Sequence, residues 1–270
     1  MKNLIYIFII AFICFSSCSN ANEQNDPIPV HENFTIQSNV LNENRNIYVW
    51  LPENYNSTTD SFPVMYMPDG GIKEDLPHIA TTLAKLIQEK KINPLILVGI
   101  ENTNRKRDLT GFTVVKKDKE IAPEFGGSNQ FRSFITNELF PEIQNRYRIT
   151  NEKTIIGESL AGLFVMETFF YKPEMFNNYI SFDPSFWWNN HDMVTNASQL
   201  ITNLPNQTIR LWFAGSQAKD IQPYTKKLAS ILKTENPKNL IWNFSDEPKE
   251  KHNTIFRATK EKAITWTLNQ

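Results

Sequence analysis

Short apolar strands alternate with helical segments along most of the chain, and this alternation constrains the fold more than any other feature. Residues 63–68 (PVMYMP) and 94–100 (PLILVGI) are almost continuously apolar, which is typical of strands covered on both faces. Between them, residues 78–91 repeat apolar side chains at helical spacing. Such alternation predicts an α/β fold, with a mostly parallel, twisted sheet of about eight strands and helices on both faces.

The predicted elements form one domain. Two strands, 34–40 and 46–51, begin it and are joined by a turn. A long polar stretch, 101–127, follows the strand that ends at residue 100. Beyond it we expect helices at 128–147, 160–171, 192–203, 221–234 and 254–268, separated by strands at 153–157, 178–183, 208–214 and 239–245. Because no repeat or second boundary is visible, residues 31–270 are expected to form a single α/β domain.

The first residues have the pattern of an export signal. Lys2 is the only charged residue before Glu23, and it precedes an apolar run of twelve residues, 4–15. That run is too short to span a bilayer, which needs about 20 residues, but it suits a signal peptide at 1–17. The run ends in the letters FSSC, which resemble a bacterial lipoprotein box with Cys18 as the lipidated residue. An ordinary signal peptide cleaved nearby is the alternative.

Charge and cysteine content exclude several classes of protein. The chain has 28 basic and 29 acidic residues, so no nucleic-acid partner is expected. Its two cysteines, Cys14 and Cys18, both lie at the amino terminus, which excludes a disulfide scaffold. Residues 18–30 are polar and indicate a flexible tether. We therefore expect an exported protein, anchored in a membrane through Cys18 and facing the periplasm or the cell exterior.

Ser159 is the candidate nucleophile. The segment Gly157-Glu-Ser-Leu-Ala161 lies between a predicted buried strand and a predicted helix, where a G-x-S-x-G nucleophile elbow belongs. The tight turn leaves little room two residues to either side of the serine, and Ala161 is a small replacement for the second glycine. Ser159 could instead serve only as a helix N-cap. Its position after the fifth predicted strand of an α/β pattern favours the nucleophile.

A nucleophilic serine needs a base, and the chain has four histidines. His252 follows the last predicted strand and directly precedes the last helix, where the order serine, acid, histidine places it. Asp220, shortly after the strand 208–214, is the favoured acid to orient the imidazole. Asp183, which ends the strand after the nucleophile, is the rival. A serine–histidine pair without an acid also remains open.

The oxyanion hole should combine two backbone amides. One is that of Leu160, directly after the nucleophile. The other should come from the loop after the third strand, where Gly70 and, second, Gly71 let amides approach a substrate carbonyl.

Several segments resemble the "putative esterase" family of α/β-hydrolases, which holds siderophore (enterobactin-type) esterases, feruloyl and other carbohydrate esterases, and S-formylglutathione hydrolase. The resemblance covers nearly all of residues 34–268, and the Pro-Ser-x-Trp-Trp element is its most specific part. It implies hydrolysis of carboxylic esters through Ser159 and His252, with a small-molecule ester as partner and no metal or organic cofactor. The matching segments are VMYMPDG (64–70), RKRDLT (105–110), GGS (126–128), GESLAGL (157–163) and DPSFWWN (183–189).

Three further residues have two interpretations each. Trp187 and Trp188 could cover a strand end in the core, or could form a stacking wall for an aromatic or sugar substrate. Arg107, followed by Asp108, could fix the polar stretch through a salt bridge, or could bind a substrate carboxylate or catecholate.

The sequence thus predicts an exported or lipid-anchored serine esterase that acts on siderophore, carbohydrate or feruloyl esters through an acyl-enzyme. Two alternatives keep the same fold. One is a lipoprotein that binds a sugar or siderophore without cleaving it, and the other is an acyltransferase.

Overall fold

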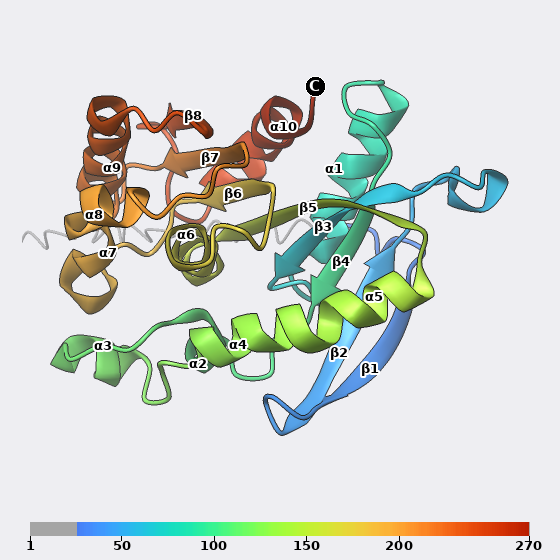
Figure 1. The fold of residues 1–270 in the computed structure, drawn as a ribbon, viewed down its shortest axis with the longest axis horizontal. Coiled ribbons are helices and arrows are strands. Elements are labelled where there is room, and N and C mark those ends of the chain that lie inside the picture. The colour runs from blue at the N-terminus through green and yellow to red at the C-terminus, as the bar shows by residue number, and fades with distance from the viewer. Residues whose placement is uncertain (1–25, 270) are drawn as a thin grey trace, which may run out of the picture.

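The structure, a computed structural model, describes residues 26–269 of the chain (Figure 1). One sheet runs through it in the strand order β1-β2-β4-β3-β5-β6-β7-β8. The β1–β2 and β2–β4 pairs are antiparallel, and all neighbours from β4 to β8 are parallel. The strands are β1 (Glu32–Ser38), β2 (Glu43–Trp50), β3 (Phe62–Pro68), β4 (Ile96–Ile100), β5 (Ile149–Glu158), β6 (Asn178–Phe182), β7 (Ile209–Gly215) and β8 (Leu240–Asp246). The predicted α/β fold with a mostly parallel sheet is confirmed.

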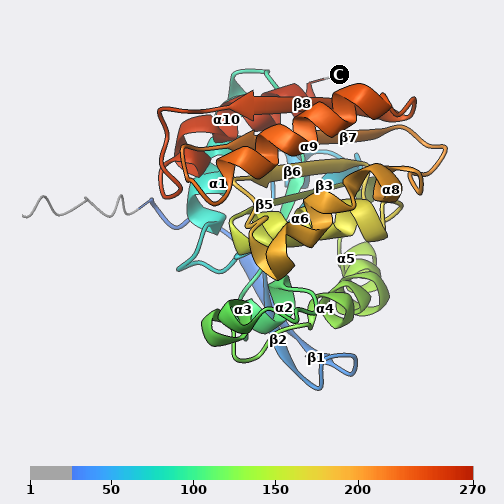
Figure 2. The same cartoon turned by 90° about the vertical axis from the view of Figure 1, so that its left-hand side faces the viewer.

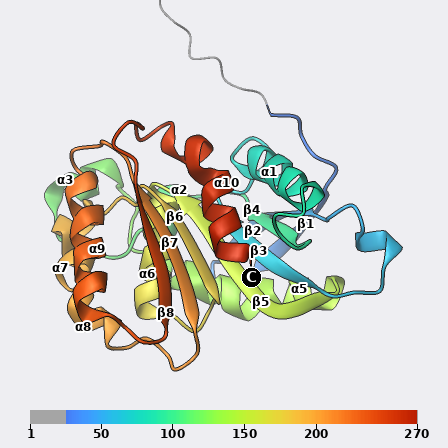
Figure 3. The ribbon, with the colours of Figure 1, turned by 90° about the horizontal axis from the view of Figure 1, so that it is seen from above.

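Helices cover both faces of this sheet (Figure 3). Helices α1 (Leu76–Gln88) and α10 (Ile255–Leu268) pack on one face, where their apolar side chains form one core with Ile156, Ile180 and Trp212. The second core fills the opposite face. Its helices are α4 (Ser128–Phe134), α5 (Phe140–Arg146), α6 (Leu160–Tyr171), α7 (Asp192–Thr195), α8 (Ala197–Ile201) and α9 (Gln222–Glu235).

Helix α6 is the element that positions the candidate nucleophile. It is buried from Leu160 to Phe170, as expected of a helix that is apolar all round. A Cβ at Gly162 would lie 2.9 Å from the carbonyl oxygen of Phe182, so glycine lets α6 approach β6 closely. This packing holds the amino terminus of α6 at the carboxyl edge of the parallel strands, where α/β folds bind their ligands.

Two segments differ from the predicted elements. The polar stretch 101–127 contains α2 (Arg105–Leu109) and α3 (Lys116–Ile121), which lie beside α4 at one side of the molecule (Figure 2). Helices of five or six residues are too short to produce a periodic signal. The predicted helix 192–203 is divided into α7 and α8, because Asn196 leaves helical geometry at φ −95°, ψ 6°. The predicted helix 128–147 does run on from α4 to α5, through a π-helical turn at Ile135–Leu139.

The predicted signal peptide, with Cys14 and Cys18, lies outside the described residues. Within residues 26–269, no helix is long and apolar enough to cross a membrane. The end of the predicted tether contacts the folded body, since Asp26 forms an ion pair of 2.6 Å with Arg257 on α10.

Candidate active site

Ser159 stands on a strained turn between β5 and α6. Its backbone angles are φ 58° and ψ −117°, which a non-glycine residue adopts only when its surroundings enforce them. A Cβ at Gly157 would lie 2.8 Å from the Cβ of Ala161, so the two small residues face each other across the turn. Because of this tight geometry the side chain of Ser159 projects from the turn, as a nucleophile elbow requires.

A continuous chain of hydrogen bonds joins Ser159, His252 and Asp183. The Nε2 atom of His252 lies 3.0 Å from Ser159 Oγ, and its Nδ1 atom lies 2.7 Å from Asp183 Oδ2. A carboxylate only accepts hydrogen bonds, so Nδ1 carries the proton in this pair. In the neutral ring Nε2 is then the acceptor, which allows it to take the hydroxyl proton of Ser159.

Asp183, and not Asp220, orients His252, so the predicted acid was wrong. Asp183 is fully buried directly after β6, where it also accepts hydrogen bonds of 2.7 Å from the backbone amide and the hydroxyl of Ser216. Asp220 is exposed after β7, at the wall of the cavity above the serine. Among the described residues, the ring of His252 bonds to Ser159 and Asp183 only. Asp183 thus accepts three hydrogen bonds, two from Ser216 and one from His252, which hold its carboxyl group beside the imidazole.

Two ionisable groups at this edge have shifted pKa values. The hydrogen bond with Asp183 raises the pKa of His252 above its ordinary value, against the opposing effect of burial. Glu158, directly before the nucleophile, has its pKa raised to about 8, first by burial and then by the negative charge of Asp75. Glu158 is therefore largely protonated at neutral pH, whereas the hydrogen bond with Asp183 stabilises the protonated form of the His252 imidazole once it has taken a proton.

The amide of Leu160 suits an oxyanion hole, but those of Gly70 and Gly71 do not. Leu160 is the first residue of α6, so its N–H has no acceptor within the helix. The Gly70 amide donates to Ile100 O at 3.0 Å and the Gly71 amide donates to Glu74 Oε2 at 2.7 Å. Both are therefore already committed, which corrects the prediction. Gly70 serves packing instead, because a Cβ there would lie 2.4 Å from the Cα of Gly99.

A cavity of about 670 Å³ opens above the serine. Trp187 lines it and is half-buried, which agrees with the predicted stacking wall. Trp188 points elsewhere: its indole is buried, donates to Gly111 O at 3.0 Å and lines a separate cavity of about 270 Å³. Of the two tryptophans, only Trp187 is therefore placed to meet a substrate. The residues around the reaction centre are Ser159, Ser185, Trp187, His191, Asp220 and His252.

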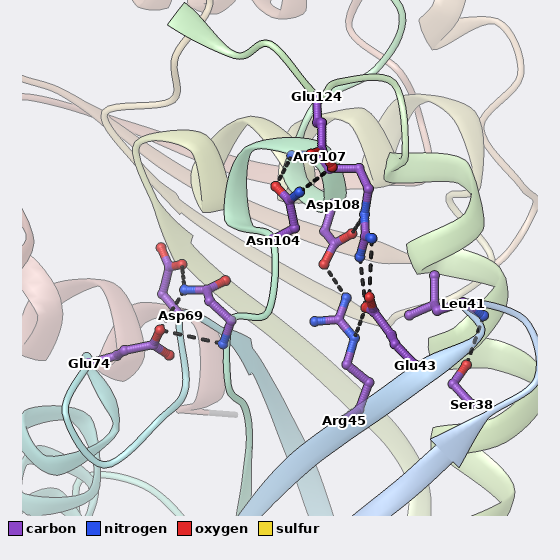
Figure 4. A network of polar contacts seen from close by, with 11 residues as sticks. Ser38, Leu41, Glu43, Arg45, Asp69, Glu74, Asn104, Arg107, Asp108 and Glu124 are labelled. Carbon is purple, nitrogen blue, oxygen red and sulfur yellow. Dashed lines mark hydrogen bonds and ion pairs between the residues drawn. The ribbon is translucent and has the colours of Figure 1, made fainter.

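Arg107 belongs to an ion-pair network on β2 and not to the cavity (Figure 4). Its guanidinium lies 2.7 Å from Glu43 Oε1 and 2.7 Å from Asp108 Oδ1, and Arg45 also pairs with Asp108. These hydrogen bonds, first that with Glu43, raise the pKa of Arg107. These contacts support the salt-bridge interpretation and place Arg107 outside the cavity above Ser159.

Sequence reasoning missed several residues of the site. Ser185 is buried with its Oγ 3.4 Å from Ser159 Oγ, and Ser216 holds Asp183. His191 and Asp118 both line the cavity. Ser185 lies in the Pro-Ser-x-Trp-Trp element, which could have suggested its place. Ser216 lies in a loop segment, His191 ends a short turn and Asp118 lies in the short helix α3, and the approach of all three to the serine depends on the whole chain path.

Comparison with known proteins agrees with this geometry. The family model described as "Putative esterase" matches residues 38–268. Ferri-bacillibactin esterase BesA of Bacillus subtilis is 25% identical over 250 residues, which cover 84% of this chain and 86% of BesA. The crystal structure of an IroE-like serine hydrolase from Shewanella oneidensis matches with a TM-score of 0.81 at 25% identity, covering 88% of this chain and 79% of that one. The BES protein from Bacillus cereus matches with a TM-score of 0.78 at 21% identity, covering 89% and 96%.

The matched region includes the nucleophile elbow, the histidine loop and the strands between them. A family model that spans almost the entire described domain, together with relatives that are esterases, identifies the class of enzyme. The chain belongs to the "Putative esterase" family and is a carboxylic ester hydrolase.

Proposed function

We propose that this protein is a serine esterase that hydrolyses the ester bonds of a siderophore. The observation that carries the proposal is the hydrogen-bonded series Ser159, His252 and Asp183, which opens on a cavity of about 670 Å³. Relatives that are named as siderophore esterases support this substrate class. They include the ferri-bacillibactin esterase BesA and the siderophore enterobactin esterase of Emericella nidulans, which is 34% identical over 80 residues.

In the first half of the proposed reaction, Ser159 Oγ attacks the ester carbonyl carbon while His252 Nε2 takes its proton. The negative charge of Asp183 stabilises the imidazolium that forms. The amide of Leu160 donates to the oxyanion of the tetrahedral intermediate. When the carbon–oxygen bond of the ester breaks, the imidazolium returns the proton to the departing alkoxide, which leaves as an alcohol.

In the second half, water replaces the alcohol and attacks the acyl-enzyme. His252 removes a proton from this water, and the acid product leaves as Ser159 recovers its hydrogen. The strained backbone of Ser159, at φ 58°, keeps Oγ within 3.0 Å of His252 Nε2 in the resting enzyme, so little reorganisation precedes attack.

The test is hydrolysis of a catecholate trilactone, with and without bound iron, followed by chromatography and mass spectrometry of the products. We expect the wild-type protein to open the ring to the linear trimer and smaller units, and Ser159→Ala to leave it intact. Tight binding of the trilactone without turnover would support a non-catalytic siderophore-binding protein instead. Product esters formed only when an acceptor alcohol is present would support acyl transfer.

We further propose that the protein is exported and carries a lipid on Cys18. The proposal is supported by the apolar run 4–15 after Lys2 and by the small residues before Cys18. Cells that express the full chain can be labelled with an alkyne fatty acid, with Cys18→Ala as the matched variant. Label on the wild type alone, in the membrane fraction, is the expected result. An unlabelled wild type, or equal label on Cys18→Ala, contradicts the anchor.

A further inference from the structure

A second histidine, His191, lines the same cavity as Ser159 and has no part in the proposed proton transfers. It ends the turn Trp188–His191, which begins at the last tryptophan of the Pro-Ser-x-Trp-Trp element, and it is half-buried. The same cavity is lined by Trp187, four residues earlier in the chain. The lining of this cavity therefore includes one imidazole and one indole besides the residues of the proton transfer.

The ring of His191 is held in one orientation by two contacts. Its Nδ1 atom lies 3.0 Å from Phe186 O, and the ring stacks on Tyr224 with centroids 3.5 Å apart and planes 9° apart. Since a carbonyl oxygen only accepts, Nδ1 carries the hydrogen of this bond. In the neutral imidazole the other nitrogen, Nε2, is consequently a hydrogen-bond acceptor with a fixed direction.

The backbone that carries His191 is also fixed, at a cost in strain. Asn189, Asn190 and His191 are consecutive left-handed residues, with φ values of 47°, 54° and 62°. Such conformations persist only when the surrounding structure enforces them. Here the buried carboxylate of Asp118 accepts from the Asn189 amide at 2.7 Å and from Thr113 Oγ1 at 2.8 Å, which fastens the turn to α3.

We propose that His191 recognises a hydroxyl group on an aromatic arm of the substrate, such as a phenol or catechol. The indole of Trp187 supplies an apolar face for the aromatic ring, and Nε2 of His191 accepts the hydrogen bond of the hydroxyl. A pre-positioned acceptor discriminates against a ring that lacks the hydroxyl, because its hydrogen bond is then lost. This inference rests on the proposed function and narrows its substrate to hydroxylated aromatic esters.

The test compares two esters that differ only in the ring hydroxyls: the methyl esters of N-(2,3-dihydroxybenzoyl)serine and N-benzoylserine. The measured quantity is the ratio of their kcat/KM values. We expect wild-type protein to prefer the hydroxylated ester and His191→Phe, which keeps an aromatic ring against Tyr224, to lose about 3- to 10-fold of that preference. Tyr224→Phe is the matched control, since it keeps the stack and His191, and should preserve the wild-type ratio.

His191→Asn provides an independent variant if His191→Phe does not fold, because asparagine adopts positive φ readily and lacks the imidazole. A wild-type ratio near one, or a ratio unchanged in the folded variant, overturns the inference. The outcome is separable from the proposed function, since the two monomeric esters can be compared whether or not the trilactone is cleaved. Conversely, cleavage of the trilactone by wild type with equal ratios in both proteins would leave siderophore hydrolysis standing and remove His191 from recognition.

Discussion

The Nδ1 atom of His252 lies 2.7 Å from Oδ2 of Asp183, although the two residues are 69 positions apart in the chain. Asp183 directly follows β6 and His252 lies in the loop after β8, with β7 between these strands in the sheet. The contact therefore reaches past β7, where Ser216 supplies two further donors to the same carboxylate. Residues at the ends of adjacent sheet strands therefore hold the Asp183 carboxyl group in place.

Replacement of Asp183 and of Asp220 should have different effects on kcat. Asp183→Asn removes the charge that stabilises the imidazolium and can present an amide N–H to Nδ1, which favours the wrong tautomer, so kcat should fall by about a thousandfold or more. Asp220→Asn changes only the exposed cavity wall, and its effect on kcat should stay below about tenfold. Steady-state kinetics on a chromogenic ester measure both. Equal losses of kcat in the two variants would contradict the assignment of Asp183 as the residue that orients His252.

The pH dependence of hydrolysis should report the raised pKa of His252. Only the neutral imidazole can accept the serine proton, so kcat/KM should fall as the pH drops through that pKa. Because the hydrogen bond with Asp183 is the main cause of the raised value, the acid limb of Asp183→Asn should lie at lower pH than that of the wild type. A limb that stays in place in the variant would show that another group controls it.

Glu158 should make the folded state less stable as the pH rises. The pKa of Glu158 in the folded protein is about 8, against an ordinary value of 4.5. The contribution of its protonated form to the stability of the folded state is therefore fully present below about pH 4.5 and is lost as the pH rises through 8. Glu158→Gln cannot ionise and should melt at least about 2 °C above the wild type at pH 8. The two melting temperatures should converge toward pH 4.5. A Gln variant that is less stable than the wild type at pH 8 contradicts the raised pKa.

Arg107 should matter for stability but not for ester hydrolysis. Arg107→Met removes the ion pairs with Glu43 and Asp108, and the free energy of unfolding should fall by about 1–3 kcal/mol. Lys116, which is 93% exposed, is the matched control, and Lys116→Met should change that energy by less than about 0.5 kcal/mol. Urea titration gives both energies. A tenfold rise in KM for Arg107→Met with unchanged stability would instead place the guanidinium on the substrate.

Local patterns predicted the parts of the site that depend on neighbouring residues. The strand–serine–helix order identified Ser159, and the observed α6 begins at Leu160, as predicted from the pattern. The histidine followed from chain order, since His252 lies between the last strand and the last helix. Both inferences use information that is contained within one turn or one topological rule.

The parts that failed depend on contacts that sequence order does not specify. Asp183 and Asp220 both follow a strand of the right kind, and burial beside Ser216 is what distinguishes them. Gly70 and Gly71 have the flexibility expected of an oxyanion loop, but their amides bond to Ile100 and Glu74. Packing across the sheet decides which acceptor a backbone amide meets, and this cannot be predicted from the glycines themselves.

The central claim is that Ser159 is the nucleophile, and labelling with a fluorophosphonate tests it most directly. After incubation with the probe, the intact protein and its peptides are weighed by mass spectrometry. We expect a single adduct on the peptide that contains Ser159, loss of ester hydrolysis in proportion to labelling, and neither label nor hydrolysis in Ser159→Ala. An adduct on another residue, or a Ser159→Ala protein that still hydrolyses esters, would contradict the account.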